Sequence, residues 1–221
     1  MADKPQGVFI DNVEFPFDDS SSILAFTDKA LGDKIIPTLC NDDNLQPYGA
    51  CRVCSVEVQQ SEDGPKRTVA SCHTPISPGM RIFTNSDSVK KLRKNIVELV
   101  LSDHPPECLT CEVNGNCQLQ DVAASVGVRK IRYAKGDNHI DREKDLSHAY
   151  MRMDLSKCIN CSRCVRACDE VQGQFTLTMT GRGFESRITT DNDMLFGDSS
   201  CVSCGACAQT CPTSAISDVF Q

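Results

Sequence analysis

Cysteine is the residue of this chain whose number and spacing point most directly to chemistry. The 221 residues include 15 cysteines, which fall into groups of four, three, four and four with none left over. The short group has a histidine, His104, four residues upstream of its first cysteine. Sixteen candidate ligands are then available, enough for four iron-sulfur clusters. They are Cys40, Cys51, Cys54 and Cys72; His104, Cys108, Cys111 and Cys117; Cys158, Cys161, Cys164 and Cys168; and Cys201, Cys204, Cys207 and Cys211.

The last two groups are an internal repeat. The motif C-x2-C-x2-C-x3-C begins at Cys158 and again, 43 residues later, at Cys201. In two-cluster bacterial ferredoxins the fourth cysteine of each run ligates the other cluster. Tetrahedral zinc, the alternative, normally uses paired C-x2-C knuckles rather than two four-cysteine runs. The repeat predicts two [4Fe-4S] clusters, with these ligands: Cys158, Cys161, Cys164 and Cys211 for one, and Cys201, Cys204, Cys207 and Cys168 for the other.

The first group has the spacing C-x10-C-x2-C-x17-C, which departs from the plant-type C-x4-C-x2-C pattern in its first interval. Gly49, two residues before Cys51, allows the backbone to approach closely, and backbone N-H groups in such a loop can bond to cluster sulfurs. A [2Fe-2S] cluster is the better fit. Taken alone, this group also matches a zinc pattern.

His104 completes the second group, His104-x3-Cys108-x2-Cys111-x5-Cys117. The alternative is a histidine that caps a helix end before two prolines. Three otherwise unmatched cysteines favour ligation of a third [4Fe-4S] cluster, in which a neutral imidazole replaces one thiolate. The other histidines, at positions 73, 139 and 148, have no such partners, and we expect surface or hydrogen-bonding roles for them.

The elements that must position the first group are short. Residues 8–15 predict two strands around an Asp-Asn turn, and residues 23–31 predict a helix with an N-cap among the preceding serines and Gly32 at its end. The segments CSVEVQ and KRTVAS predict a hairpin. A small sheet with one helix across it follows, and we place this domain at residues 1–82, with three of its cysteines on the loop after the helix.

The middle of the chain predicts two helices joined by turns. Apolar spacing gives a helix over residues 87–101, capped by Asp87 or Ser88, and QLQDVAASV gives a second helix that ends at Gly127. A basic string on the first helix is expected to be a solvated face; it consists of Lys90, Lys91, Arg93 and Lys94. Residues 128–147 are charged and poor in apolar side chains, which predicts a surface linker.

The amino-acid composition limits the possible domain sizes, partners and cellular locations. The sequence is 40% hydrophobic and only 5% aromatic. This composition favours small domains stabilised by bound metal over one domain with a single large core. The net charge of −7 disfavours a nucleic-acid surface. The sequence lacks 18 consecutive apolar residues and a basic start followed by an apolar run, so we expect no membrane span, no secretory signal and a cytoplasmic location. A reducing compartment favours metal ligation over disulfides.

These motifs together resemble a known family. PTLC, YGACRVCSVEV and SC, then H-x3-C-x2-C-x5-CQLQD, then the two-cluster repeat resemble the iron-sulfur portion of the complex I large subunit. That portion recurs in NAD-reducing and iron-only hydrogenases and in the alpha subunit of NAD-dependent formate dehydrogenases. The resemblance covers residues 8 to 217, and all sixteen ligand positions match in order. CINCSRCVRACDEVQG, GRGFESRI and CVSCGACAQTCPTSAI look most like the formate dehydrogenase subunit.

The resemblance implies an α+β fold with three parts. These are a plant-type [2Fe-2S] ferredoxin-like (β-grasp) domain at 1–82, a small helical [4Fe-4S] domain with one histidine and three cysteine ligands, plus linker, at 83–147, and a bacterial-type 2[4Fe-4S] ferredoxin domain at 148–221. It also implies one [2Fe-2S] and three [4Fe-4S] clusters, and an electron-transfer role between a flavin-bearing NADH module and a distant catalytic site.

The expected partners follow from the same resemblance. They are a flavin/NADH-binding iron-sulfur subunit and a catalytic subunit of formate dehydrogenase or hydrogenase type, in a hetero-oligomer. The formate dehydrogenase relatives continue into a large pterin-binding region, whereas this sequence ends ten residues after Cys211. We therefore expect no flavin, nicotinamide or pterin site in this sequence and no catalysis by it alone. Substrate chemistry then comes from partner subunits, or the sequence is a fragment of a longer chain.

Two other function classes accommodate the cysteines. A zinc-binding interaction module would be colourless and would contain stoichiometric zinc. An iron-sulfur regulator that senses redox state would need an effector domain, and the sequence shows no sign of one.

Overall fold

The computed structural model describes residues 7–135 and 142–219, and the chain divides into two compact units. The first comprises Met1–Thr38 and Pro47–Ile96, and the second Leu39–Gln46 and Val97–Gln221. Residues 136–141 of the predicted linker, which include His139, lie outside the described residues. The three sequence domains remain a proposal.

The first unit is built on a mixed five-stranded sheet of strand order β2-β1-β5-β3-β4. Its strands are β1 (Val8–Ile10), β2 (Val13–Phe15), β3 (Ser55–Gln59), β4 (Arg67–Ala70) and β5 (Arg81–Phe83). β1 runs antiparallel to β2 and parallel to β5. The β1–β2 turn places Asp11 and Asn12 at φ of 46° and 73°, a left-handed conformation that these two residue types tolerate. Both predicted hairpins are confirmed, since β3 also pairs antiparallel with β4.

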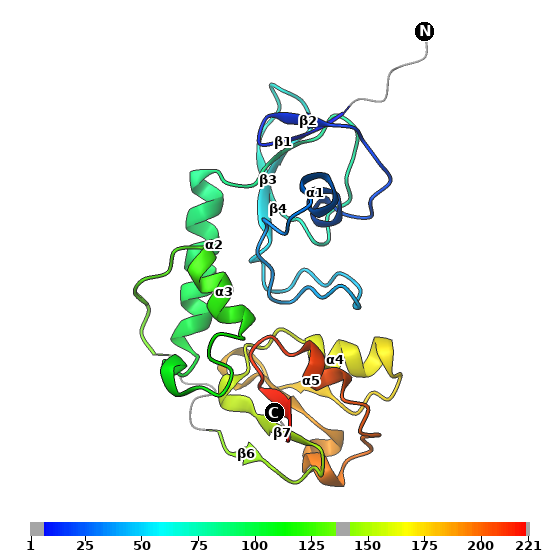
Figure 1. Ribbon diagram of the computed structural model, residues 1–221, viewed down its shortest axis with the longest axis vertical. Helices are drawn as coiled ribbons and strands as arrows, with labels where there is room; N and C mark the ends of the chain where they lie inside the picture. Colours follow the sequence, from blue (N-terminus) through cyan, green and yellow to red (C-terminus); the bar gives the residue numbers. More distant parts are fainter. Residues whose placement is uncertain (1–6, 136–141, 220–221) are drawn as a thin grey trace. The chain divides into compact units, whose positions relative to one another are not determined.

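Helix α1 (Ile23–Leu31) packs on this sheet (Figure 1) and supplies much of the core of the unit. The side-chain oxygen of Ser22 accepts a hydrogen bond from the Ala25 backbone N-H at 3.2 Å. Gly32, at φ 67°, ends the helix in a left-handed conformation that costs glycine little. The predicted helix and both of its ends are confirmed. Ile23 and Phe26 on its buried face pack with Ile82 of β5 in one apolar cluster.

The Ser22 cap gives a stability prediction for the first unit. Ser22→Ala should lower the free energy of unfolding by about 1 kcal/mol, because the Ala25 N-H loses its side-chain acceptor. The shift in the urea midpoint measures this. Ser21→Ala is the matched control, since Ser21 is exposed and should change stability by less than about 0.5 kcal/mol. Equal shifts for the two variants would contradict the capping role.

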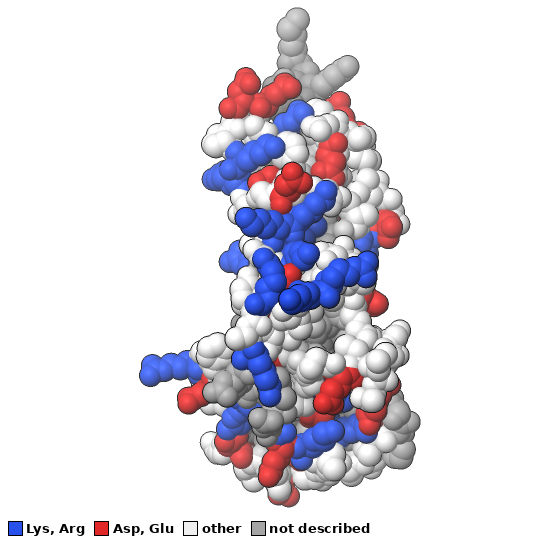
Figure 2. Space-filling model, turned by 90° about the vertical axis from the view of Figure 1, so that its left-hand side faces the viewer, with Lys and Arg blue, Asp and Glu red and all other residues white. Residues whose placement is uncertain are grey.

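Helix α2 (Asp87–Ser102) confirms the predicted helix, but its N-cap is Ser86 and not Asp87 or Ser88. Ser86 stands three residues before Val89, whose N-H it accepts at 3.3 Å, and this is the geometry of a capping side chain. Figure 2 shows Lys and Arg side chains gathered on the face that includes α2. Arg93 is the exception to the predicted solvated face. It is 5% exposed and donates to the Ser55 carbonyl of β3 at 3.0 Å.

The second unit combines short helices with two small sheets. The three-stranded sheet has the order β10-β7-β6 and the other pairs β8 with β9. The strands are β6 (Lys144–Asp145), β7 (Met151–Asp154), β8 (Thr178–Thr180), β9 (Arg187–Thr189) and β10 (Ile216–Asp218). The helices are α3 (Gln118–Ser125), α4 (Arg163–Arg166) and α5 (Ala206–Thr210), with a π-helical segment at Ala167–Val171. Single 3-10 turns lie at Cys108–Thr110, Leu155–Lys157, Gly183–Glu185, Asp191–Asp193 and Phe196–Asp198.

The sequence predictions for this unit are confirmed for helix α3 and wrong in part for the linker. Helix α3 is confirmed, and Gly127 follows it with a φ of 68°. The linker prediction for residues 128–147 is wrong at its end, because Lys144 and Asp145 form β6 and pair with Asp154 and Met153 of β7. Charge alone does not exclude an edge strand, since edge strands are commonly charged. Within the described residues, no helix is both long enough and apolar enough to cross a membrane.

Candidate iron-sulfur sites

Two small cavities in the second unit are each lined by four cysteines. One is bordered by apolar residues that include Ile188 and Ile216, and the other by Met151, Leu177 and Phe196. The first contains Cys158, Cys161, Cys164 and Cys211, and the second contains Cys168, Cys201, Cys204 and Cys207. The structure thus brings the cysteines of the two runs together with their fourth members exchanged. Metal ligation by these sets stays a prediction.

The loops between the cysteines have the same backbone design in both runs. Asn160 and Ser203, each two residues after the first cysteine of its run, adopt φ of 52° and 59°. Their backbone N-H groups donate to Cys158 Sγ and Cys201 Sγ, both at 3.4 Å. Such N-H donors stabilise a thiolate and tune a cluster bound to it. The third cysteine of each run then enters α4 or α5, so a loop and a helix together fix all three sulfurs.

Burial controls the protonation of these thiols. It raises the pKa of Cys158 to about 11 and the pKa of Cys161 and Cys207 to about 12, and that of Cys164 well above its usual value. Only the thiolate binds metal, so binding must displace these protons. Cys204 of the second cavity is exposed, whereas Cys158, Cys161 and Cys164 of the first cavity are buried.

His104 lies between the end of α2 and the turn at Cys108–Thr110, and its backbone N-H donates to the Leu101 carbonyl at 3.3 Å. Cys117 is the N-cap residue of α3. All four predicted ligands of this group, His104, Cys108, Cys111 and Cys117, line one cavity of about 830 Å³. Burial raises the pKa of Cys117. The structure therefore brings the imidazole and three thiols to a common space.

The predicted ligands of the first group belong to both units. Cys51, Cys54 and Cys72 belong to the first unit, and Cys40 belongs to the segment Leu39–Gln46 of the second. The sulfurs of Cys54 and Cys72 lie 3.4 Å apart and both residues are buried. Two thiolates on one tetrahedral metal lie about 3.7 Å apart when metal-sulfur bonds are about 2.3 Å. Cys54 and Cys72 are therefore close enough to share a metal.

His148 is a supporting residue that the sequence pattern did not single out. It is 8% exposed, and its Nδ1 accepts from the backbone N-H groups of Tyr150 and Met151, both at 3.1 Å. Its Nε2 lies 3.2 Å from the Ser203 hydroxyl, inside the loop between Cys201 and Cys204. His73 is exposed. Both placements agree with the expected surface or hydrogen-bonding roles.

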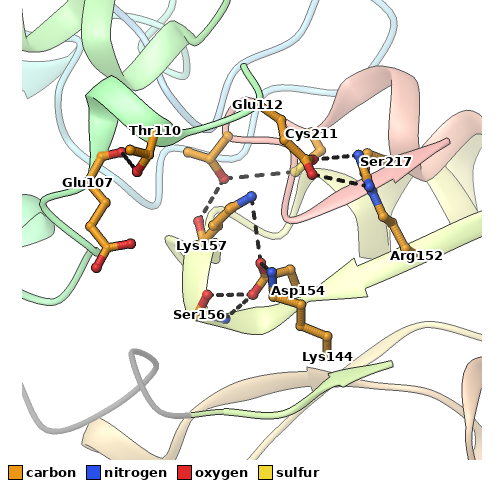
Figure 3. A network of polar contacts seen from close by, with 11 residues as sticks. Glu107, Thr110, Glu112, Lys144, Arg152, Asp154, Ser156, Lys157, Cys211 and Ser217 are labelled. Atoms are coloured by element: carbon orange, nitrogen blue, oxygen red, sulfur yellow. Dashed lines mark hydrogen bonds and ion pairs between the residues drawn. The ribbon is translucent and has the colours of Figure 1, made fainter. Parts of the chain in front are cut away.

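A polar network joins the segment after His104 to strand β7 (Figure 3). Glu112, next to Cys111, pairs with Arg152 of β7 at 2.6 Å. Asp154, at the end of β7, accepts from the Ser156 hydroxyl and N-H and pairs with Lys144 Nζ at 3.2 Å. These contacts connect the segment that contains Cys108 and Cys111 with strand β7, which precedes Cys158 in the chain.

Asp154 gives a pH prediction. Burial alone would raise the pKa of Asp154, but Ser156 and Lys144 outweigh it and the pKa lies below its usual value. Stability from this carboxylate is therefore present above the unfolded pKa and is lost as the pH falls through the folded pKa. Asp154→Asn should cost about 1 to 3 kcal/mol above about pH 4, and this cost should shrink at lower pH.

The measurement is the difference in unfolding midpoint between wild type and Asp154→Asn across the pH series, under anaerobic conditions. Acid effects common to both proteins cancel in that difference. A difference that does not depend on pH would rule out the carboxylate as its source.

Among the described residues, no three His, Cys, Asp or Glu side chains converge closely enough to hold a single metal ion. In the second unit the cysteines instead surround cavities, in sets of four or of three with a histidine. Donor sets of this kind are those of iron-sulfur clusters.

Three family models match the chain in order. Residues 7–87 match a 2Fe-2S iron-sulfur cluster binding domain, residues 93–132 the NADH-ubiquinone oxidoreductase-G iron-sulfur binding region, and residues 157–215 a 4Fe-4S dicluster domain. The structure resembles a crystal structure of NAD+-reducing [NiFe]-hydrogenase in the H2-reduced state, with a TM-score of 0.84 and 28% identity over 98% of this chain and 88% of that one.

Curated relatives extend the likeness. The NADP-reducing hydrogenase subunit HndD of Solidesulfovibrio fructosivorans is 39% identical over 82% of this chain and 31% of its own length. The G 2 subunit of the NADH-quinone oxidoreductase of Rhizobium meliloti (strain 1021) is 31% identical over 95% of this chain and 23% of its own length. The chain thus spans less than a third of these relatives.

The particular likeness to formate dehydrogenase stays a prediction. The order of the three models, the two relatives and the shared structure agree on the broader assignment. Over its three matched iron-sulfur binding regions, the chain is therefore similar to iron-sulfur subunits of complex I-like oxidoreductases and NAD(P)-linked hydrogenases.

Proposed function

We propose that this chain holds one [2Fe-2S] and three [4Fe-4S] clusters and relays electrons between an NAD(H)/flavin module and a partner catalytic site of hydrogenase or formate dehydrogenase type. The observation that carries the proposal is the pair of cavities, each lined by four cysteines drawn from two separate runs. A bound cluster supplies a one-electron carrier. The cluster number fits the sixteen ligand positions of the sequence.

The residues of the chain have three tasks in such a relay. The cysteines and His104 hold the clusters in the four sets given above. Buried apolar residues such as Ile188, Ile216 and Phe196 exclude water from the two ferredoxin-like cavities. Backbone N-H groups in the cysteine loops donate to sulfur, which sets the potential together with burial.

The exposure of the cysteines favours one of the sites for electron exchange with a partner. Cys204 is exposed, so the site of Cys168, Cys201, Cys204 and Cys207 is the better placed of the two ferredoxin-like sites to exchange electrons with a partner. We propose partners of two kinds, a flavin/NADH-binding iron-sulfur subunit and a catalytic subunit, in a hetero-oligomer. Because reduced thiols are needed for cluster assembly, we also propose a cytoplasmic location.

Metal content and reducibility test the function. Protein purified anaerobically should be brown, with about fourteen irons and matching sulfide per chain. NADH should reduce it only in the presence of a flavin-bearing partner. A colourless protein with stoichiometric zinc would establish the interaction-module alternative instead. Iron clusters that a flavin partner and NADH leave oxidised would contradict the relay.

His104 can be tested separately. His104→Cys should retain a cluster but lower its reduction potential, because a thiolate adds one negative charge where a neutral imidazole stood. Redox titration followed by EPR measures the shift, with His73→Cys as the control because His73 is exposed. Unchanged titrations and spectra would remove His104 from the ligand set.

A further inference from the structure

Arg163 is a buried cation inside one of the cysteine runs. It lies in α4 between Cys161 and Cys164 and is 4% exposed. A buried guanidinium needs nearly all of its N-H groups satisfied, and it needs a counter-charge. The partners of Arg163 are therefore informative about its role.

Those partners come from three separate segments. Arg163 Nε donates to the Thr210 hydroxyl at 3.2 Å, and Nη1 donates to Gln118 Oε1 at 2.6 Å. Nη1 also lies 3.4 Å from the Leu39 carbonyl oxygen, and Nη2 pairs with Asp42. All of these segments belong to the second unit.

Three of the partners are sequence neighbours of a predicted ligand. Leu39 precedes Cys40, Gln118 follows Cys117, and Thr210 precedes Cys211. Arg163 itself precedes Cys164. One guanidinium therefore contacts residues beside ligands of three different predicted clusters, the [2Fe-2S] cluster, the His104 cluster and the cluster of Cys158, Cys161, Cys164 and Cys211.

The counter-charge is fixed by the same network. Asp42 Oδ2 also accepts from the Thr210 hydroxyl at 3.0 Å, and its Oδ1 accepts from the Asn44 N-H at 3.0 Å. A second arginine in α4 strengthens the attachment, since Arg166 donates to the carbonyl oxygens of Cys40 and Gln46. The planar guanidinium of arginine has five N-H donors and can bond to several acceptors at once. A lysine ammonium in the same place cannot reach the same set of acceptors.

We propose that Arg163 is a positioning residue that joins the ligand-bearing segments of three clusters and sets the potentials of the clusters beside it. This inference rests on the proposed electron-transfer function. Through Leu39, Gln118 and Thr210 the guanidinium holds three ligands in register with α4. Its positive charge stabilises the reduced, more negative form of a nearby cluster.

Two substitutions separate charge from geometry. Arg163→Gln removes both the positive charge and the planar set of N-H donors, whereas Arg163→Lys keeps only the charge. Arg187→Gln is the matched control, because Arg187 is also in the second unit and paired with an aspartate, Asp193, but its pair is partly exposed and joins residues of one local loop.

The measurement is EPR-monitored redox titration of the anaerobic protein, with pulsed EPR for the magnetic coupling between clusters. Arg163→Gln should shift the potentials of the His104 cluster and the Cys158 cluster downward and weaken their coupling. Arg163→Lys should restore the potentials but not the coupling. Iron loss from Arg163→Gln that Arg163→Lys reverses would also support the role, since the charge alone then rescues assembly.

Three results overturn the inference. They are unchanged potentials and coupling in Arg163→Gln, potentials in Arg163→Lys that are as low as those in Arg163→Gln, and the same shifts in Arg187→Gln. Failure of the proposed function looks different, because the wild-type protein itself would then lack iron-sulfur EPR signals.

Discussion

Removal of iron from the anaerobic protein is expected to unfold the core of the second unit while the sheet of the first unit keeps its hydrogen-exchange protection. In the second unit, buried cysteines are themselves part of the apolar core: Cys158, Cys164 and Cys207 pack with Met151, Met153, Leu177, Ile188, Phe196 and Ile216. Without metal, these positions become thiols around cavities. Such a core loses both its cross-links and its packing.

The size of the free energies involved supports complete unfolding of the second unit. Structural metal sites in small zinc domains contribute about 10 to 16 kcal/mol of folding free energy. Whole domains are stable by only about 5 to 15 kcal/mol. Two clusters in this core therefore exceed what the remaining contacts can replace.

The first unit differs because its core is mostly aliphatic. Val8, Ile10, Ile23, Phe26 and Ile82 pack there with only two cysteines, Cys54 and Cys72, in the cluster of buried residues. Hydrogen exchange after chelation should show loss of protection in β7 and β10, and retention in β1, β3 and β5. Reconstitution with iron and sulfide should restore β7 and β10. Protection that survives chelation in β7 and β10 would refute the dependence on metal.

Substitution of the fourth cysteines is expected to remove the clusters in a crossed pattern. Cys211→Ala should abolish the cluster of Cys158, Cys161 and Cys164, and Cys168→Ala should abolish the other, because the cavities combine the cysteines in that way. Each variant should lose about four irons. Iron analysis and the EPR spectra of the remaining clusters give the readout.

Double variants make the test decisive. Cys158→Ala combined with Cys211→Ala should lose no more iron than either change alone, since both act on one site. Cys158→Ala combined with Cys168→Ala should lose about eight irons, since the two changes act on different sites. The opposite pattern would show that each run holds its own cluster. A cysteine outside the two runs, Cys51, serves as control, because Cys51→Ala should leave all three [4Fe-4S] signals intact.

The sequence alone predicted most of the features that depend on residues near one another in the chain. The hairpin at residues 8–15 and the helix at 23–31 were predicted, because turn types and capping residues act over three or four positions. The spacing of the cysteine runs predicted their chemistry for the same reason. The cap of α2 was missed by one residue, since Ser86, Asp87 and Ser88 are all acceptable caps and only the backbone conformation selects Ser86.

Contacts between distant segments were decided by the tertiary structure. No local pattern marks Lys144–Asp145 as a strand, places His148 under the Cys201 loop, or buries Arg93 against Ser55. The same holds for Arg163, whose partners at Leu39, Asp42, Gln118 and Thr210 are 45 to 124 residues away. Sequence spacing predicts the first three ligands of each cysteine run, because they lie within a few residues of one another, whereas the fourth cysteine of each cavity comes from the other run. Packing fixes what surrounds them, because burial and long-range hydrogen bonds depend on which segments meet in the folded chain.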